Sequence, residues 1–162
     1  MNKAIRVIYT IFIGVLFAIF VGVGIAAFYE GPKPPNYPSE LSYPMTKDKS
    51  AAEDRKNLEM QKEYDEKQKL FEKEIRIYNR NVSVISIVAS IIVLMLSLVL
   101  IKKILLIADG LLIGGVLTLI YSIIRGFDTE GNMFRFLIVT VGLIASLVIG
   151  YVKFIKPTET SI

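Results

Sequence analysis

Four stretches of this chain are apolar enough and long enough to cross a lipid bilayer, and this feature constrains the fold more than any other. They cover residues 4–28, 82–101, 104–125 and 133–152. A membrane-spanning helix needs about 20 mostly apolar residues, and each stretch comes close to that length. The sequence therefore predicts an all-α polytopic membrane protein with four transmembrane helices. The first apolar run is longer than the core of a secretion signal, about 7–15 residues, so we expect it to remain as a span.

The basic residues near the ends of these spans predict how the chain is oriented. Three sites fall on one face of a four-span protein, and they carry Lys3, Arg6, Lys102, Lys103, Lys153 and Lys156. Because positive charge in short loops marks the cytoplasmic side, both termini, including the tail 153–162, are expected in the cytoplasm, with the spans in the cell (inner or plasma) membrane. The net charge of +4 lies on this face, where it favours anionic lipid and requires no nucleic acid.

Several kinds of chemistry find no support in the residues present. The chain has no cysteine and no histidine, which removes the thiolate nucleophile, the commonest general base and the commonest metal ligand. There is also no glycine-rich phosphate loop and no pair of acids within the spans. We therefore expect no catalytic residue, no metal, no cofactor and no small-molecule substrate.

The segment between the first two spans divides into two parts. Residues 29–49 are rich in proline, which favours extended chain. Residues 50–81 read as a charged helix, opened by a capping box at Ser50 and Glu53 and strengthened by acid-first pairs four residues apart, namely Glu63–Lys67, Asp65–Lys69 and Glu72–Arg76.

One side of that helix carries a partial apolar stripe, made of Met60, Tyr64, Phe71, Ile75 and Tyr78. We expect the proline-rich part, through Tyr37, Leu41 and Tyr43, to lie against the stripe in a hairpin. Two alternatives remain open. The helix could stand alone in solvent behind an irregular linker, or the stripe could pair with another copy or another subunit.

Small residues recur at every fourth position within three of the spans. The sets are Gly14, Ala18, Gly22 and Ala26; Gly110, Gly114, Thr118, Ser122 and Gly126; and Gly142, Ser146 and Gly150. The second span instead has Ser83, Ser86, Ser90 and Ser97 along one side. Because small residues let helices approach closely in lipid, these ridges predict a compact bundle. Alternatively, one ridge docks another subunit or copy, or the hydroxyl groups line a polar path.

Asp109 is the acid nearest the membrane interior. Two positions compete for the turn between the second and third spans, the Lys102–Lys103 pair and Asp109–Gly110. We expect Asp109 to cap the N-terminus of the third span, with an ion or proton site as the alternative. Arg125 and Arg135 are expected to reach outward from the external ends of the last two spans.

These observations favour an integral membrane scaffold or accessory subunit that presents an external helical arm for protein–protein interaction. The spans carry packing ridges without chemistry, and the segment between the first two spans has its own ordering signals. The expected partners are the lipid bilayer and other membrane subunits, or further copies of the chain. The alternative is a subunit of a small homo-oligomeric channel or transporter.

Overall fold

The computed structural model describes residues 3–42 and 51–155, and within these ranges the chain is helical without any strand. The elements are α1 (Lys3–Phe28), the 3-10 helix η1 (Ser39–Ser42), α2 (Ala51–Leu100), α3 (Leu105–Phe127), α4 (Asn132–Gly150) and the π-helix η2 (Tyr151–Ile155). α1, α2, α3 and α4 are each long and apolar enough to cross a membrane. The prediction of an all-α chain with four such helices is confirmed. The predictions on Tyr43, Ser50 and the tail from Lys156 lie outside the described residues.

The chain forms two compact units. We call Met1–Glu30 together with Asn79–Ile162 the bundle unit, and Gly31–Tyr78 the loop unit. The first part of α2 belongs to the loop unit and its remainder to the bundle unit. The separately predicted charged helix (50–81) and second span (82–101) are therefore one continuous helix.

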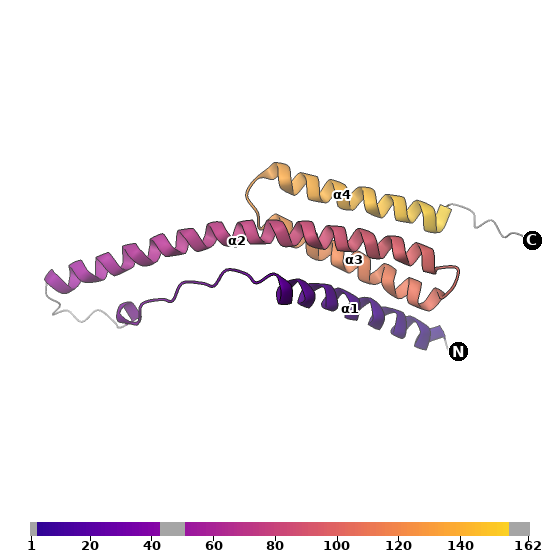
Figure 1. Ribbon diagram of the computed structural model, residues 1–162, viewed down its shortest axis with the longest axis horizontal. Coiled ribbons are helices and arrows are strands. Elements are labelled where there is room, and N and C mark those ends of the chain that lie inside the picture. The colour runs from indigo at the N-terminus through magenta and orange to yellow at the C-terminus, as the bar shows by residue number, and fades with distance from the viewer. Residues whose placement is uncertain (1–2, 43–50, 156–162) are drawn as a thin grey trace, which may run out of the picture. The chain divides into compact units, whose positions relative to one another are not determined.

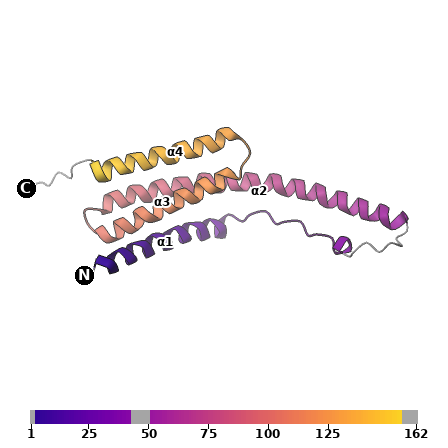
Figure 2. The same ribbon diagram turned by 180° about the vertical axis from the view of Figure 1, so that it is seen from behind.

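Within the bundle unit, successive helices run in opposite directions. The start of α1, the turn between α2 and α3, and the end of α4 lie together at one end (Figures 1 and 2). We call this the basic end, because it carries Lys3, Arg6, Lys102, Lys103 and Lys153. α3 is the central helix, since its residues contact α1, α2 and α4.

A regular row of serine hydrogen bonds joins α2 to α3. Ser83, Ser90 and Ser97 recur every seventh residue, as in an antiparallel coiled coil, and all three are fully buried. Their hydroxyls donate to the backbone oxygens of Ser122, Gly115 and Ala108 at 2.7, 2.8 and 2.6 Å. The partners are also seven residues apart, so every bond fixes the same register. The serine side predicted for the second span thus lies against α3.

Glycine contacts join α1 to the opposite side of α3. A Cβ atom added at Gly14 would lie 2.6 Å from Ile113 Cγ2, and one added at Gly110 would lie 2.6 Å from Ile13 Cγ2. At Gly114 the added atom would lie 2.9 Å from Cβ of Phe17. Because carbon atoms in contact normally lie about 3.5–4.0 Å apart, only glycine allows this approach.

The two turns of the bundle unit have different causes. Between α2 and α3 the chain turns at residues 101–104, where the amide of Ile104 donates to the carbonyl of Leu100 at 2.9 Å. The turn therefore lies at the lysine pair, and the alternative turn at Asp109–Gly110 is wrong. Between α3 and α4, Gly131 has φ of 100°, a backbone region that side chains with a Cβ rarely enter.

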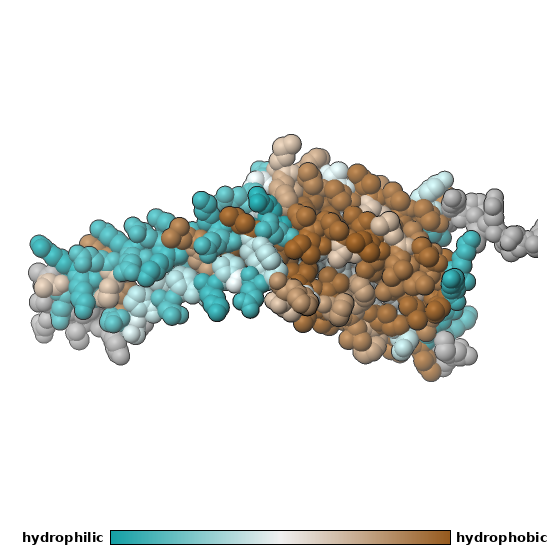
Figure 3. Space-filling model, in the orientation of Figure 1, coloured by the Kyte–Doolittle hydropathy of each residue, from teal (hydrophilic) through white to brown (hydrophobic). Residues whose placement is uncertain are grey.

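The surface of the bundle unit is strongly apolar. Large exposed hydrophobic side chains occur on all four long helices, including Phe20, Val99, Ile124 and Leu147. Figure 3 shows this apolar surface covering the visible face of the bundle unit, with hydrophilic atoms at the basic end. A surface of this kind is typical of a face that lipid or another protein covers.

In the loop unit, the extended segment and α2 contact one another. Pro32, Pro35, Pro38 and Leu41 are half-buried and recur every third residue, the period of polyproline II. The ring of Tyr37 lies edge-on to that of Tyr64 at 5.2 Å, and a Cβ atom at Gly31 would lie 3.3 Å from the ring of Tyr78. These are the contacts expected of a hairpin between the two parts.

Candidate functional site

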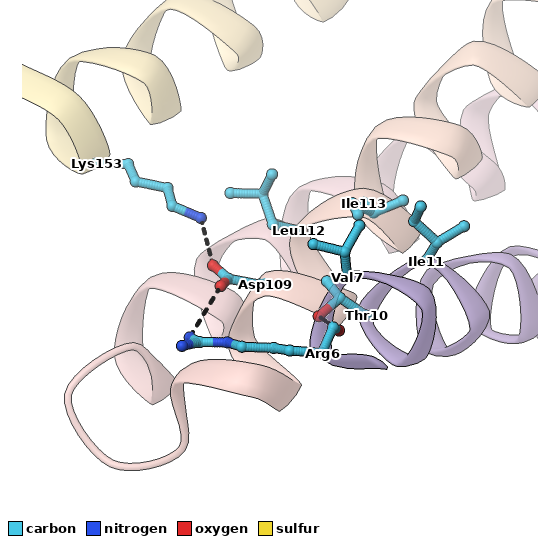
Figure 4. Close-up of a pocket in the computed structure, with 8 residues that line it drawn as sticks. All are labelled: Arg6, Val7, Thr10, Ile11, Asp109, Leu112, Ile113 and Lys153. Carbon is cyan, nitrogen blue, oxygen red and sulfur yellow. Dashed lines mark hydrogen bonds and ion pairs between the residues drawn. The ribbon is translucent and has the colours of Figure 1, made fainter. Parts of the chain in front are cut away.

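A cluster of charged side chains surrounds Asp109, where three elements of the bundle unit meet at the basic end. Lys153 of η2 donates a hydrogen bond from Nζ to Oδ1 of Asp109 at 2.8 Å. Arg6 of α1 approaches the other oxygen, with Nη2 3.8 Å from Oδ2. Figure 4 shows both cations directed at the carboxylate from opposite sides. Asp109 of α3 therefore connects α1 to η2.

A pocket of about 330 Å³ lies beside this ion-pair cluster. Its polar lining consists of the three charged groups and Thr10, whose hydroxyl donates to the Arg6 carbonyl at 2.9 Å. Its other walls are apolar side chains of α1 and α3: Val7, Ile11, Leu112 and Ile113. The pocket thus places charge next to a hydrocarbon surface.

Asp109 does not lie at the N-terminus of α3. The N-cap of α3 is Ile104, which makes no side-chain capping bond, and Asp109 lies one turn inside the helix. The predicted capping role is therefore wrong. The carboxylate instead neutralises cations from two other elements, a role that spacing along the chain could not reveal.

A second polar cluster, at the far end of α3, joins that helix to α2. The buried side chain of Asn79 accepts a hydrogen bond from Arg125 Nη1 at 2.9 Å and donates one to Asp128. Arg125 also donates from Nε to the Tyr121 hydroxyl at 3.1 Å, and its guanidinium carbon lies 5.5 Å from the centre of that ring. Sequence reasoning did not single out Asn79, because an asparagine at the edge of an apolar run carries no specific signal.

The two arginines at this end differ from expectation. Both were predicted to reach outward, but both are half-buried. Arg125 bonds to Asn79, and Arg135 donates from Nη2 to the Thr129 carbonyl at 2.9 Å. They therefore hold the α3–α4 loop and the α2–α3 interface as well as marking the end of the apolar region.

The predicted packing ridges contact other helices only in part. On α3 the whole set is buried: Gly110, Gly114, Thr118, Ser122 and Gly126. On α1, Gly14 packs against α3, whereas Ala18 is half-buried, Ala26 is exposed, and a Cβ atom at Gly22 would meet nothing within 4 Å. On α4, Gly142 lies against Leu119, while Ser146 is exposed and Gly150 opens onto free space.

Two residues of the predicted partner stripe of α2, Tyr64 and Tyr78, contact the chain's own extended segment. All five of its residues are half-buried: Met60, Tyr64, Phe71, Ile75 and Tyr78. The loop unit instead leaves other large apolar side chains of α2 exposed, among them Leu58, Leu70 and Ile77. Leu70 and Ile77 are seven residues apart and so share a helix face, a pairing that the sequence analysis missed.

The described residues contain no group of three or more histidine, cysteine, aspartate or glutamate side chains placed to hold a metal ion. Comparison with protein-family models, with curated proteins and with solved structures finds no match. Functional inference therefore depends on the physical character of the two units alone.

Proposed function

We propose that this chain is an integral membrane scaffold or accessory subunit, without chemistry of its own, that presents its loop unit to a protein partner. The bundle unit would anchor the chain in the cell membrane with both termini in the cytoplasm. The loop unit would then stand on the opposite side of the membrane. The basic residues grouped at one end of the bundle unit support this orientation.

The single observation that carries the proposal is the use of polar groups within the bundle unit. The hydroxyls of Ser83, Ser90 and Ser97 bond to the backbone of α3. Asp109 pairs with cations of two other elements, and Asn79 joins α2 to α3. These groups connect helices to one another and do not converge on a reacting centre. Such bonds between helices are what a rigid anchor needs.

The exposed side chains of the loop unit support its proposed role as an interaction surface. Its extended segment and α2 hold one another through aromatic and proline contacts, including the Tyr37–Tyr64 pair. This arrangement still leaves Leu70 62% exposed and Ile77 45% exposed on one helix face. Apolar side chains held on a locally ordered unit are typical of the centre of a protein–protein contact.

The test is to extract the protein from its native membrane in a mild detergent and to measure the mass and composition of the purified particle. Other polypeptides at a fixed ratio would support the accessory-subunit function. A pure homo-oligomer would favour the channel or transporter alternative, and a lone monomer would contradict a stable subunit role.

A double variant, Leu70→Ser with Ile77→Ser, locates the contact. It should release the partner while leaving the Tyr37–Tyr64 contact in place, because neither side chain belongs to that pair. Gln61→Ser is the control, as it changes an exposed position on another face of the same helix. Equal loss of the partner in the control, or retention in the double variant, would move the contact away from this face.

A further inference from the structure

The pocket beside Asp109 combines two features that the scaffold function does not require. One wall is cationic, through Arg6 and Lys153, and the other is hydrocarbon, through side chains such as Val7 and Ile11. Both features belong to the same cavity of about 330 Å³, at the point where the apolar surface of the bundle unit meets its basic end. The close-up in Figure 4 shows the apolar side chains gathered to one side of the ion pairs.

The charges that line the pocket do not balance. Among the described lining residues, two cations face the one carboxylate of Asp109, so the lining carries an excess of one positive charge. The two pairs are also unequal. Lys153 is only 14% exposed and makes a hydrogen bond of 2.8 Å, whereas Arg6 is 42% exposed and lies 3.8 Å away. Since 3.8 Å exceeds hydrogen-bond length, the Arg6 guanidinium keeps donors for another oxygen.

We propose that this pocket binds an anionic phospholipid, with its phosphate at Arg6 and an acyl chain along the apolar wall of α1 and α3. The inference rests on the membrane location given in the proposed function. Phosphate oxygens match the guanidinium, which presents planar, charged donors. Basic pockets between transmembrane helices on the cytoplasmic side are known settings for anionic headgroups. A small soluble anion would satisfy the cation but leave the hydrocarbon wall uncovered.

Lipid binding here would have a structural consequence. The pocket is lined by α1, α3 and η2, so one lipid would contact the first helix, the central helix and the end of the last. Because a ligand that binds the folded state stabilises it, the bundle should unfold at a higher temperature when the anionic lipid is present.

The experiment compares the full chain with three variants in vesicles of phosphatidylcholine with or without phosphatidylglycerol. After mild extraction, native mass spectrometry counts the phosphatidylglycerol that each protein retains. Arg6→Gln removes the donor, and Val7→Trp fills the apolar wall while keeping every charge. Lys103→Gln is the control, because it removes an equal charge from an exposed position at the same end.

The expected result is a loss of about tenfold in retained phosphatidylglycerol for Arg6→Gln, since a direct hydrogen bond between charged groups is worth at least that factor. Val7→Trp should lose a similar amount, and Lys103→Gln should change little. Equal losses in Arg6→Gln and Lys103→Gln would show diffuse surface attraction and overturn the proposal. Unchanged retention in Val7→Trp would overturn the acyl-chain part.

Further outcomes distinguish free phosphate from a lipid headgroup, and failure of the lipid site from failure of the membrane location on which it rests. If inorganic phosphate added to phosphatidylcholine vesicles raises the unfolding temperature as much as phosphatidylglycerol does, the site takes free phosphate and the lipid proposal fails. A chain that inserts into neutral vesicles yet shows no preference for phosphatidylglycerol refutes the lipid site alone. A chain that does not insert refutes the membrane location and the lipid site together.

Discussion

Replacing Gly14 with leucine should loosen α1 from the bundle, whereas the same change at Gly22 should not. The two glycines lie eight residues apart on one predicted ridge of α1. A Cβ atom at Gly14 would lie 2.6 Å from Ile113 Cγ2 and 3.1 Å from the carbonyl oxygen of Gly110. At Gly22 the added atom would meet nothing within 4 Å.

The magnitude follows from these distances. Carbon atoms in contact lie about 3.5–4.0 Å apart, so the Cβ atom alone demands a shift of about 1 Å, and leucine adds three further carbons. Ile113 could change rotamer, but the backbone oxygen of Gly110 could not move away without shifting α3. Overpacking of this kind costs about 1–3 kcal/mol. The gain in helix propensity from glycine to leucine is shared by both variants and cancels in their comparison.

The assay can exploit the absence of cysteine from the chain. Cysteines introduced at Lys3 and Lys103, both exposed at the basic end, would carry a donor and an acceptor dye. Energy transfer between them reports whether α1 remains on the bundle as sodium dodecyl sulfate is titrated into mild-detergent micelles. Gly14→Leu should lose transfer at a lower dodecyl sulfate fraction than the parent, and Gly22→Leu should follow the parent.

Two results would refute this reasoning. If Gly14→Leu unfolds at the parent's detergent fraction, the glycine contact between α1 and α3 does not hold the folded protein together. If Gly22→Leu is as disruptive in a monomer, α1 packs through a different part of its ridge. If Gly22→Leu disrupts only an oligomer, the part of the ridge around Gly22 contacts another chain. That result would favour the alternative in which one ridge docks another subunit or copy.

Three further predictions concern single contacts. Ser90→Ala should destabilise the α2–α3 pair by about 0.6 kcal/mol, and by at most about 1.7 kcal/mol. Ser86→Ala should be neutral, because the buried Ser86 hydroxyl has no hydrogen-bond partner in the described structure. Detergent unfolding measures the stability of both variants. Asn79→Ala should cost about 1–3 kcal/mol in the same assay, because it leaves charged neighbours without a buried partner. In the loop unit, the hydrogen bond from Lys67 and then its charge lower the pKa of Glu63, so Lys67→Gln should raise that pKa toward its ordinary value in an NMR titration. A lowered pKa adds stability at neutral pH that is lost as pH falls through the folded-state value. An unchanged Glu63 titration would show that the pair does not form in solution.

The helices themselves could be predicted because their signal is local. Length and uninterrupted apolar composition are enough to indicate a span. α1, α3 and α4 begin and end within a few residues of the predicted bounds, whereas α2 continues through the boundary predicted between residues 81 and 82. The turn at residues 101–104 was ambiguous because no glycine or proline marks it. Besides the local bond from the Ile104 amide to the Leu100 carbonyl, the Ser97 hydroxyl bonds to the Ala108 carbonyl across the turn, and no local sequence pattern predicts that contact.

The site was harder to predict, because its residues come from distant parts of the chain. Asp109 was singled out, but its partners Arg6 and Lys153 were interpreted only as markers of orientation. Spacing along a sequence shows which residues share a helix face. It does not show which faces meet, and for the same reason Gly14 and Gly22 appeared equivalent although only Gly14 contacts α3.

The polar clusters at the two ends of α3 would set both the depth of the bundle unit in a membrane and the register between its helices. Asp109 and Arg125 are 16 residues apart, which is about 24 Å along a helix. No charged residue of α3 lies between them, and this distance falls short of a hydrocarbon core of about 30 Å. Long basic side chains can extend toward the interface to cover such a difference, yet here they bond to neighbouring elements. Arg6 and Lys153 meet Asp109, and Arg125 meets Asn79. The residues that would fix the depth of the bundle in the membrane therefore also fix the register between its helices, so a change at either cluster should affect both.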